Sequence, residues 1–262
     1  MPGECAVHRL GQIPYMEAWR LQEQLSAEIA AGLRPPTLLL LEHPHTFTFG
    51  RKGDARNLLW DEAELRQRGV TVHWVDRGGD VTYHGPGQLV GYPLIPLAER
   101  GLLSNQIDTG SEQTTNRIPQ ADYVGYVRRL EETLIGALAS VGIASAQLKG
   151  LTGVWVQAHV PSRCQVCPPE IFQKPAKIAA IGVKVDVRGI SRHGFALNVD
   201  PDMSYWDGII GCGLKDSSVV SLADLMHPVP SMEKVMDAVT ASFGNVFGYS
   251  LKTTPLINRG NT

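Results

Sequence analysis

The chain has 262 residues, of which 43% are hydrophobic and 19% are charged. That length fits one domain, that balance is typical of a globular protein, and no apolar run approaches the roughly 20 residues that a membrane-spanning helix needs. Lys and Arg number 24 against 26 Asp and Glu, so the overall charge excludes a general attraction to nucleic acid or to anionic membranes.

The start of the chain and its cysteines indicate the compartment. Residues 1–9 lack the basic start and long apolar stretch of a secretory signal, and also the Arg-rich and Ser-rich character of a transit peptide, so we expect a cytoplasmic protein. The four cysteines, Cys5, Cys164, Cys167 and Cys212, are too sparse for a disulfide scaffold. We interpret each of them as a free thiol.

The first half of the chain mixes helical and strand-like patterns. Residues 14–33 repeat leucine or isoleucine every four positions, which predicts an amphipathic helix, and an acidic first turn predicts a short helix over 61–68. Apolar or alternating runs predict strands at residues 37–41, 45–49 and 70–75. The glycine-rich and proline-rich segment 77–97 suits two strands joined by a tight turn.

The second half predicts two longer helices. One covers residues 122–141, with Asp122 as its cap, and the other covers 231–247. Strands are expected at residues 153–157, 177–187 and 195–199.

Two polar or proline-rich stretches, residues 104–121 and 158–176, match no element, and we interpret them as loop insertions. The remaining pattern predicts one α/β or α+β domain over residues 1–262. We expect a mixed sheet with its helices packed on one face.

The segment 77–88 has the composition of a pocket wall, with the sequence RGGDVTYHGPGQ. Glycine lets the backbone approach a ligand closely, and the Arg, Thr, Tyr and His side chains supply polar groups beside it. Glycine content alone equally suits a hairpin with incidental polar residues. The spacing matches neither phosphate-binding glycine motif, so a nucleotide cradle has no support.

Two cationic or titratable residues accompany apolar strands. Lys177 begins such a strand, where its ammonium is partly desolvated unless it meets an anion or a reactive group. A lysine at a strand end that reaches back to water is the alternative. His193, beside a glycine, is open to both a catalytic and a structural interpretation.

Cys212 lies between two glycines, where little covers its side chain, as suits a nucleophile that meets a bulky thioester. An inert core thiol is the usual alternative for a single cysteine. Cys164 and Cys167 form one C-x-x-C pair with His159 as the only neighbouring further ligand, so we expect no metal site there.

Together these blocks resemble the octanoyltransferases of lipoate synthesis. The blocks are RGG-x-x-TYHGPGQ at 77–88, KIAAIG at 177–182, HGFALN at 193–198 and CG at 212–213. Shorter matches, LEHP at 41–44, GR at 50–51 and GVWV at 153–156, support them. The resemblance spans about residues 37–226 and keeps the order of that family.

The resemblance implies the fold of the catalytic domain of biotin and lipoate ligases, an α/β sheet with flanking helices. It implies transfer of an octanoyl or lipoyl group from acyl carrier protein to a lysine on another protein, the first step of endogenous protein lipoylation. The implied acceptors are the lipoyl domains of 2-oxoacid dehydrogenase complexes and the glycine-cleavage H protein. Because the acyl group arrives activated, the implied reaction needs no ATP, metal or redox cofactor.

Position by position, the resemblance makes Cys212 the nucleophile that carries the acyl thioester. It makes Lys177 the residue that lowers the pKa of this cysteine and transfers protons, since an ammonium beside a thiol favours the thiolate. The implied acyl pocket is lined by Arg77, Gly78, Gly79, Asp80, Val81, Thr82, Tyr83, His84, Ala180, Ile181, Gly182, His193, Gly194 and Phe195.

Two other functions fit the same fold. An ATP-dependent lipoate or biotin ligase shares a lysine at the position that resembles Lys177, but its chemistry needs no cysteine at 212. A noncatalytic module that binds the carrier protein would keep the fold without turnover. The two insertions look longer than the family usually shows, so the resemblance assigns no site residue to them.

Overall fold

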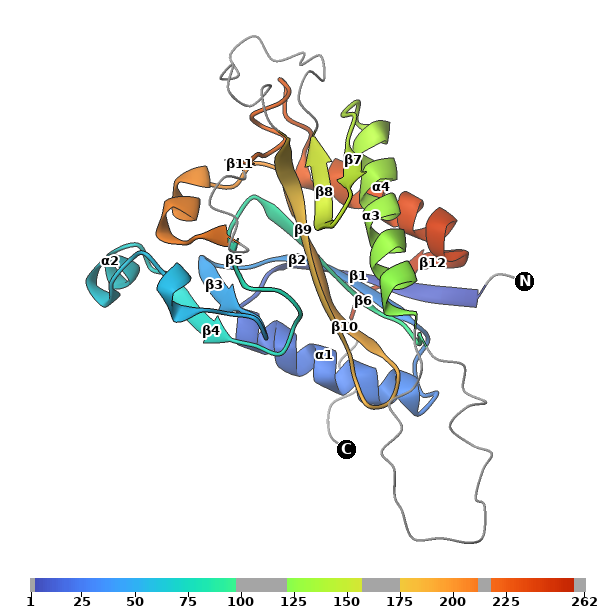
Figure 1. Cartoon of the computed structure of the whole chain (residues 1–262). Coiled ribbons are helices and arrows are strands. Elements are labelled where there is room, and N and C mark those ends of the chain that lie inside the picture. Colours follow the sequence, from blue (N-terminus) through green and yellow to red (C-terminus); the bar gives the residue numbers. More distant parts are fainter. Residues whose placement is uncertain (1–2, 98–121, 157–174, 212–217, 257–262) are drawn as a thin grey trace, which may run out of the picture.

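The computed structural model describes residues 3–97, 122–156, 175–211 and 218–256. Its main sheet runs in the order β12-β1-β2-β6-β10-β9-β8-β7 (Figure 1). The strands of this sheet are β1 (Gly3–Gln12), β2 (Thr37–Glu42), β6 (Gln88–Leu94), β7 (Ala146–Leu148), β8 (Leu151–Val156), β9 (Ala176–Val185), β10 (Ser191–Asn198) and β12 (Tyr249–Thr253). A ninth strand, β11 (Ser218–Val219), pairs in parallel with the start of β9.

A second sheet of three strands lies beside the first. Its order is β4-β3-β5, with the strands β3 (Thr46–Phe49), β4 (Thr71–Trp74) and β5 (Val81–His84), and the short helix α2 (Glu62–Gln67) connects β3 to β4. Phe47, Phe49 and Tyr83 form the buried core of this sheet. The β4–β5 connection, residues 75–80, passes between the two sheets and contributes to the cavity described below.

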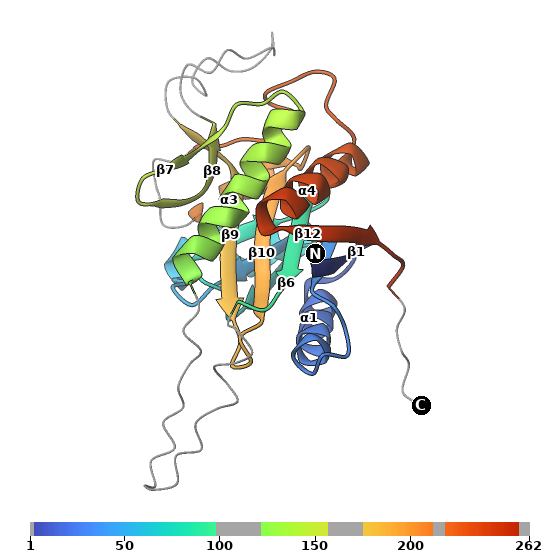
Figure 2. The ribbon, with the colours of Figure 1, turned by 90° about the vertical axis from the view of Figure 1, so that its right-hand side faces the viewer.

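Helices cover both faces of the main sheet (Figure 2). The helix α1 (Tyr15–Ala30) packs on one face, against Leu39 and Leu41 of β2. The helices α3 (Tyr123–Ser140) and α4 (Met232–Phe247) pack on the opposite face, against Leu38 and Leu40. The expectation of helices on one face was therefore wrong. The continuous apolar run of β2 arises because successive side chains of a strand point to opposite faces and both faces are buried here.

Side-chain caps fix where the long helices start. The carboxylate of Asp122 accepts a hydrogen bond from the Gly125 amide at the start of α3, and the hydroxyl of Ser231 accepts one from the Lys234 amide at the start of α4. Gly248 ends α4 in the left-handed conformation, with a φ of 71°. Such caps satisfy backbone groups that lack partners within the helix.

Most predicted elements are present, and their boundaries differ in informative ways. β9 begins at Ala176, which was assigned to an insertion, and ends at Val185. β10 begins at Ser191 rather than Phe195, because the polar residues that precede Phe195 are buried and their side chains form hydrogen bonds with residues outside the strand. The strands β1, β7, β11 and β12 were not predicted. The predicted insertions, apart from 175 and 176, lie outside the described residues.

Within the described residues, no helix is long and apolar enough to cross a membrane.

Candidate active site

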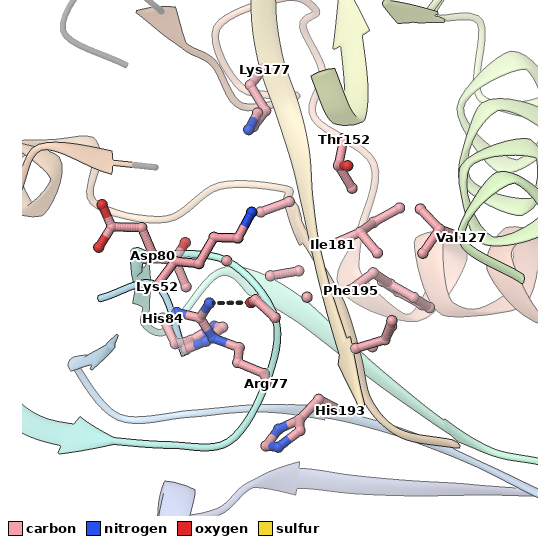
Figure 3. Close-up of a pocket in the computed structure, with 18 of the residues that line it drawn as sticks. Lys52, Arg77, Asp80, His84, Val127, Thr152, Lys177, Ile181, His193 and Phe195 are labelled. Carbon is pink, nitrogen blue, oxygen red and sulfur yellow. Dashed lines mark hydrogen bonds between the residues drawn. The ribbon is translucent and has the colours of Figure 1, made fainter. Parts of the chain in front are cut away.

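A cavity of about 600 Å³ lies between the residue 77–80 loop, β5, β9 and β10. Figure 3 shows Lys177 at one end of this cavity and His193 at the other. Lys52, Asp80 and Arg77 lie on one side of β9, while Thr152, Val127 and Phe195 lie on the other. Three of the four segments singled out from the sequence, 77–88, 177–182 and 193–198, fall within the described residues and line this cavity.

The buried guanidinium of Arg77 holds one wall of the cavity. Its Nε and Nη2 lie 3.2 and 2.9 Å from the hydroxyl oxygen of Thr48, and Nη1 donates to the Gly78 carbonyl at 2.9 Å. Gly79 has a φ of 87°, which favours glycine. A Cβ on Gly50 would lie 2.4 Å from the carbonyl oxygen of Gly79, so this position also requires glycine. This wall therefore depends on both glycines and on one buried cation.

Small residues form the floor of the cavity. Gly182 of β9 pairs with Gly194 of β10, and Ala180 pairs with Ala196. The Gly78 amide donates to the Val183 carbonyl at 3.0 Å, so the wall is fastened to the outer edge of β9. A Cβ on Gly182 would lie 3.0 Å from the Gly78 carbonyl oxygen. Close approach of the wall to the floor explains why this position is glycine.

Alternation along β5 divides the predicted pocket residues into two groups. Thr82 and His84 line the cavity, whereas Val81 and Tyr83 point into the core of the second sheet. The phenol of Tyr83 lies 2.9 Å from Nδ1 of His45, away from the cavity. Val81 and Tyr83 were expected to line the acyl pocket, and the structure places them in the core of the second sheet instead.

Aromatic and polar side chains close the end of the cavity that contains His193. This residue has a φ of 55°, and its Nε2 donates to the Asp76 carboxylate at 2.7 Å. The hydroxyl of Tyr15 lies 3.4 Å from Nδ1 of the same imidazole. Tyr92 and His84 complete this end.

Burial keeps the imidazoles at this end neutral. It lowers the pKa of His193, although the hydrogen bond to Asp76 acts in the opposite direction. Burial, together with the nearby His43 and Arg77, holds the pKa of His84 well below its usual range. Burial also opposes ionisation of Asp76, but hydrogen bonds from His193 and Lys184 outweigh it and lower the pKa of this carboxyl. A neutral His193 therefore faces an ionised Asp76.

Lys177 lies at the other end of the cavity. It is only 8% exposed, and its Nζ lies 4.8 Å from the centre of the Trp155 ring. The alternative of a lysine that reaches to bulk water therefore does not apply.

Cys212 lies outside the described residues, in the segment 212–217. Both flanks of this segment are described. On one side, the Ile210 amide donates to the Asn57 carbonyl at 2.9 Å. On the other side, Val219 pairs with Lys177, and the Val220 amide donates to the Lys177 carbonyl at 3.0 Å. Residues 218–220 thus lie beside the backbone of Ala176 and Lys177.

Several residues of this site were not predicted from the sequence. Among them are Tyr15, Lys52, Asp76, Tyr92, Val127 and Thr152. Lys52, Asp76 and Thr152 directly flank recognised motifs, and that adjacency was the available signal. The others carry none, because an aromatic or apolar residue in a helix or strand reads as core.

No three His, Cys, Asp or Glu side chains gather as a metal site in the part of the chain that is described. Cys164 and Cys167 lie outside that part.

Comparison with known proteins decides the family. The family model described as the lipoyl protein ligase A/B catalytic domain matches residues 14–244. An octanoyltransferase of Chloroflexus aurantiacus is 44% identical over 92% of this chain and 93% of its own length. An octanoyltransferase of Acidobacterium capsulatum is 41% identical over 92% of this chain and 89% of its own length. The chain belongs to the octanoyltransferases of the lipoyl protein ligase A/B family.

Solved structures establish the fold of this octanoyltransferase. A lipoate protein ligase of Thermoplasma acidophilum has a TM-score of 0.66 at 14% identity, and the match covers 98% of this chain and 88% of the ligase chain. A lipoate-protein ligase A bound with ATP has a TM-score of 0.61 at 13% identity, and the match covers 98% of this chain and 90% of the ligase chain. The predicted ligase-type fold and the predicted enzyme class are both confirmed.

Proposed function

We propose that this enzyme transfers an octanoyl group from acyl carrier protein to a lysine of lipoyl domains through a thioester on Cys212. The carrying observation is the position of Lys177, buried at the end of the cavity where the chain returns from the segment that contains Cys212. The same activity extends to a lipoyl group, and the acceptors include the glycine-cleavage H protein. The whole chain acts as one catalytic domain, in the cytoplasm.

The first half-reaction forms the acyl-enzyme. The Cys212 thiolate attacks the carbonyl carbon of the octanoyl thioester, and the thiolate of the carrier protein's prosthetic arm leaves. The Lys177 ammonium favours the attacking thiolate and gives its proton to the leaving sulfur. Because one thioester replaces another, no ATP, metal or redox cofactor is required.

The second half-reaction releases the enzyme. The neutral amine of the acceptor lysine attacks the Cys212 thioester, an amide bond forms, and the Cys212 thiolate leaves. Lys177, having given up its proton in the first step, takes the proton from the attacking amine. Donor and acceptor therefore react in turn, which gives ping-pong kinetics.

The cavity provides the acyl site. Four small residues, Ala180, Gly182, Gly194 and Ala196, leave room above the floor, and the loop at 77–79 covers them. Burial of each methylene of an octanoyl chain contributes about 0.8 kcal/mol. The neutral His84 and His193 at the far end allow an apolar chain to approach without desolvating a charged imidazole.

Intact-protein mass spectrometry after mixing with octanoyl-acyl carrier protein tests this proposal. Wild type should gain one octanoyl mass, and Cys212→Ala should gain none. Lys177→Ala should lose most of the adduct at neutral pH and recover part of it at higher pH, where the thiol ionises without help. An adduct that persists in Cys212→Ala would overturn the mechanism.

The two rival functions give different results in the same assay. An ATP-dependent ligase would modify lipoyl domain with free octanoate and ATP, and we expect no transfer under those conditions. A noncatalytic binding module would retain octanoyl-acyl carrier protein without a covalent adduct.

A further inference from the structure

One acidic side chain buried in the core has no part in the proposed acyl transfer. Glu131 of α3 is fully buried, and its Oε2 accepts from Nη1 of Arg128 at 2.6 Å. Its Oε1 accepts from the Gly153 amide of β8 at 3.0 Å. Burying a carboxylate among apolar side chains is costly unless it is paired and hydrogen-bonded. Glu131 therefore occupies a position in the core where an apolar residue would pack, and its Oε1 accepts a hydrogen bond from one backbone amide.

That amide belongs to an irregular point in β8. Gly153 has a φ of 116°, and the pairing of β8 with β9 shifts register between Val154 and Trp155. A Cβ on Gly153 would lie 2.6 Å from the Ala179 carbonyl oxygen and 3.4 Å from Cε of Lys177. The glycine thus allows the bulge and leaves room for the stem of the lysine.

Trp155 contacts the other end of the same lysine. This residue is 1% exposed, the centre of its ring lies 4.8 Å from Lys177 Nζ, and the two residues pair across β8 and β9. An ammonium over an aromatic face is attracted by the ring's quadrupole. Two residues of β8 therefore position the lysine: Gly153 leaves space for its methylene chain, and Trp155 lies against its ammonium.

We propose that Glu131 is a positioning residue for Lys177. Its hydrogen bond to the Gly153 amide holds β8 at the bulge between β8 and β9, where Ile178 of β9 is the extra residue. This pairing sets both the space for the lysine stem and the place of Trp155 under the ammonium. Loss of this bond lets β8 re-pair in the regular register, and the ammonium loses its fixed position. This inference rests on the proposed Cys212 and Lys177 mechanism.

The test measures the pKa of Cys212 from the pH dependence of its alkylation by iodoacetamide, which needs no acyl substrate. Cys164→Ser and Cys167→Ser are present in every protein, so that Cys212 is the thiol measured. Cys5 does not interfere, because burial raises the pKa of its thiol to about 12. Lys177→Met sets the value expected when the ammonium is absent.

Glu131→Met removes the acceptor at similar size, while Glu131→Gln keeps an acceptor for the Gly153 amide. Arg128→Gln is the matched control, because it removes the ion pair and leaves that hydrogen bond. We expect Glu131→Met to raise the Cys212 pKa toward the Lys177→Met value, by about one unit, with roughly tenfold slower alkylation at pH 7. Glu131→Gln and Arg128→Gln should stay within about twofold of wild type.

A wild-type Cys212 pKa in folded Glu131→Met would overturn the inference, as would an equal shift in Arg128→Gln. Should Glu131→Met fail to fold, Trp155→Leu removes the aromatic ring that lies against the Lys177 ammonium. This variant tests the same positioning of Lys177 and should raise the Cys212 pKa as well. A wild-type value in Trp155→Leu would count against the proposal. A wild-type value in Lys177→Met would refute the mechanism itself, and with it this inference.

Discussion

At the scale of single residues, side-chain alternation decides which parts of a motif reach the cavity. The motif at 77–88 was read as one continuous wall, but on β5 only Thr82 and His84 face the cavity. Val81 and Tyr83 face the second sheet, whose existence could not be deduced from local pattern. Glycine was a better guide, because a glycine is required wherever two backbones approach closely.

Gly182 offers the sharpest test of the acyl site. In Gly182→Val the new side chain would begin 3.0 Å from the Gly78 carbonyl oxygen and 3.1 Å from Cδ of Arg77, and would occupy the floor. We expect octanoyl adduct formation to slow roughly tenfold or more, because the valine side chain takes up space that the acyl chain needs. The fold should be retained, because overpacking at one site typically lowers the free energy of unfolding by only about 1 to 3 kcal/mol. Intact-protein mass spectrometry over time measures the rate.

Val187→Ala is the control for this substitution. Val187 lies in the same β9–β10 hairpin and is 86% exposed, so its truncation should leave the rate unchanged. An unchanged rate in folded Gly182→Val would mean that the acyl chain does not use this floor.

At the scale of elements, strong periodicity predicted the helices and central strands, and weak patterns failed. Asp122 and the leucine spacing placed α3 correctly, since both signals are local. β1 and β12 pair with each other in parallel although they lie near opposite ends of the sequence. β1 has no alternating pattern, and the alternation of β12 covers only five residues. The start of β10 was missed because its polar residues are satisfied only by tertiary partners, such as Asp76 for Arg192.

The double burial of β2 gives an element-scale prediction. Leu39 and Leu40 are both fully buried, but they face different helix layers. We expect Leu39→Ala and Leu40→Ala each to lower the free energy of unfolding by about 2 to 5 kcal/mol. Urea titration followed by circular dichroism measures this. Leu33→Ala, at a position 69% exposed, should change it by less than about 0.5 kcal/mol. A small effect of Leu39→Ala alone would argue against a packed layer on the α1 face.

At the scale of the whole molecule, buried and half-buried histidines link stability to pH. The structure lowers the pKa of six of them, His8, His43, His45, His73, His84 and His193, in each case chiefly through burial. Unfolding exposes these imidazoles, so the unfolded chain binds more protons than the folded chain below about pH 6.5. The free energy of unfolding should therefore be highest above pH 6.5 and should fall as the pH drops.

His43 allows this dependence to be isolated. Burial lowers its pKa to about 4 despite the hydrogen bond to the Ile13 carbonyl, and Nε2 lies 2.8 Å from the Tyr92 hydroxyl. Its contribution is complete above pH 6.5 and is lost between pH 6.5 and 4, by about 3 kcal/mol in total. His43→Gln retains a donor and an acceptor without titrating, so its unfolding free energy should fall less steeply over this range. Chemical denaturation at half-unit pH steps measures the slope, with His227→Gln, an exposed position, as the control that keeps the wild-type slope. Equal slopes for His43→Gln and wild type would show that His43 takes up its proton without unfolding.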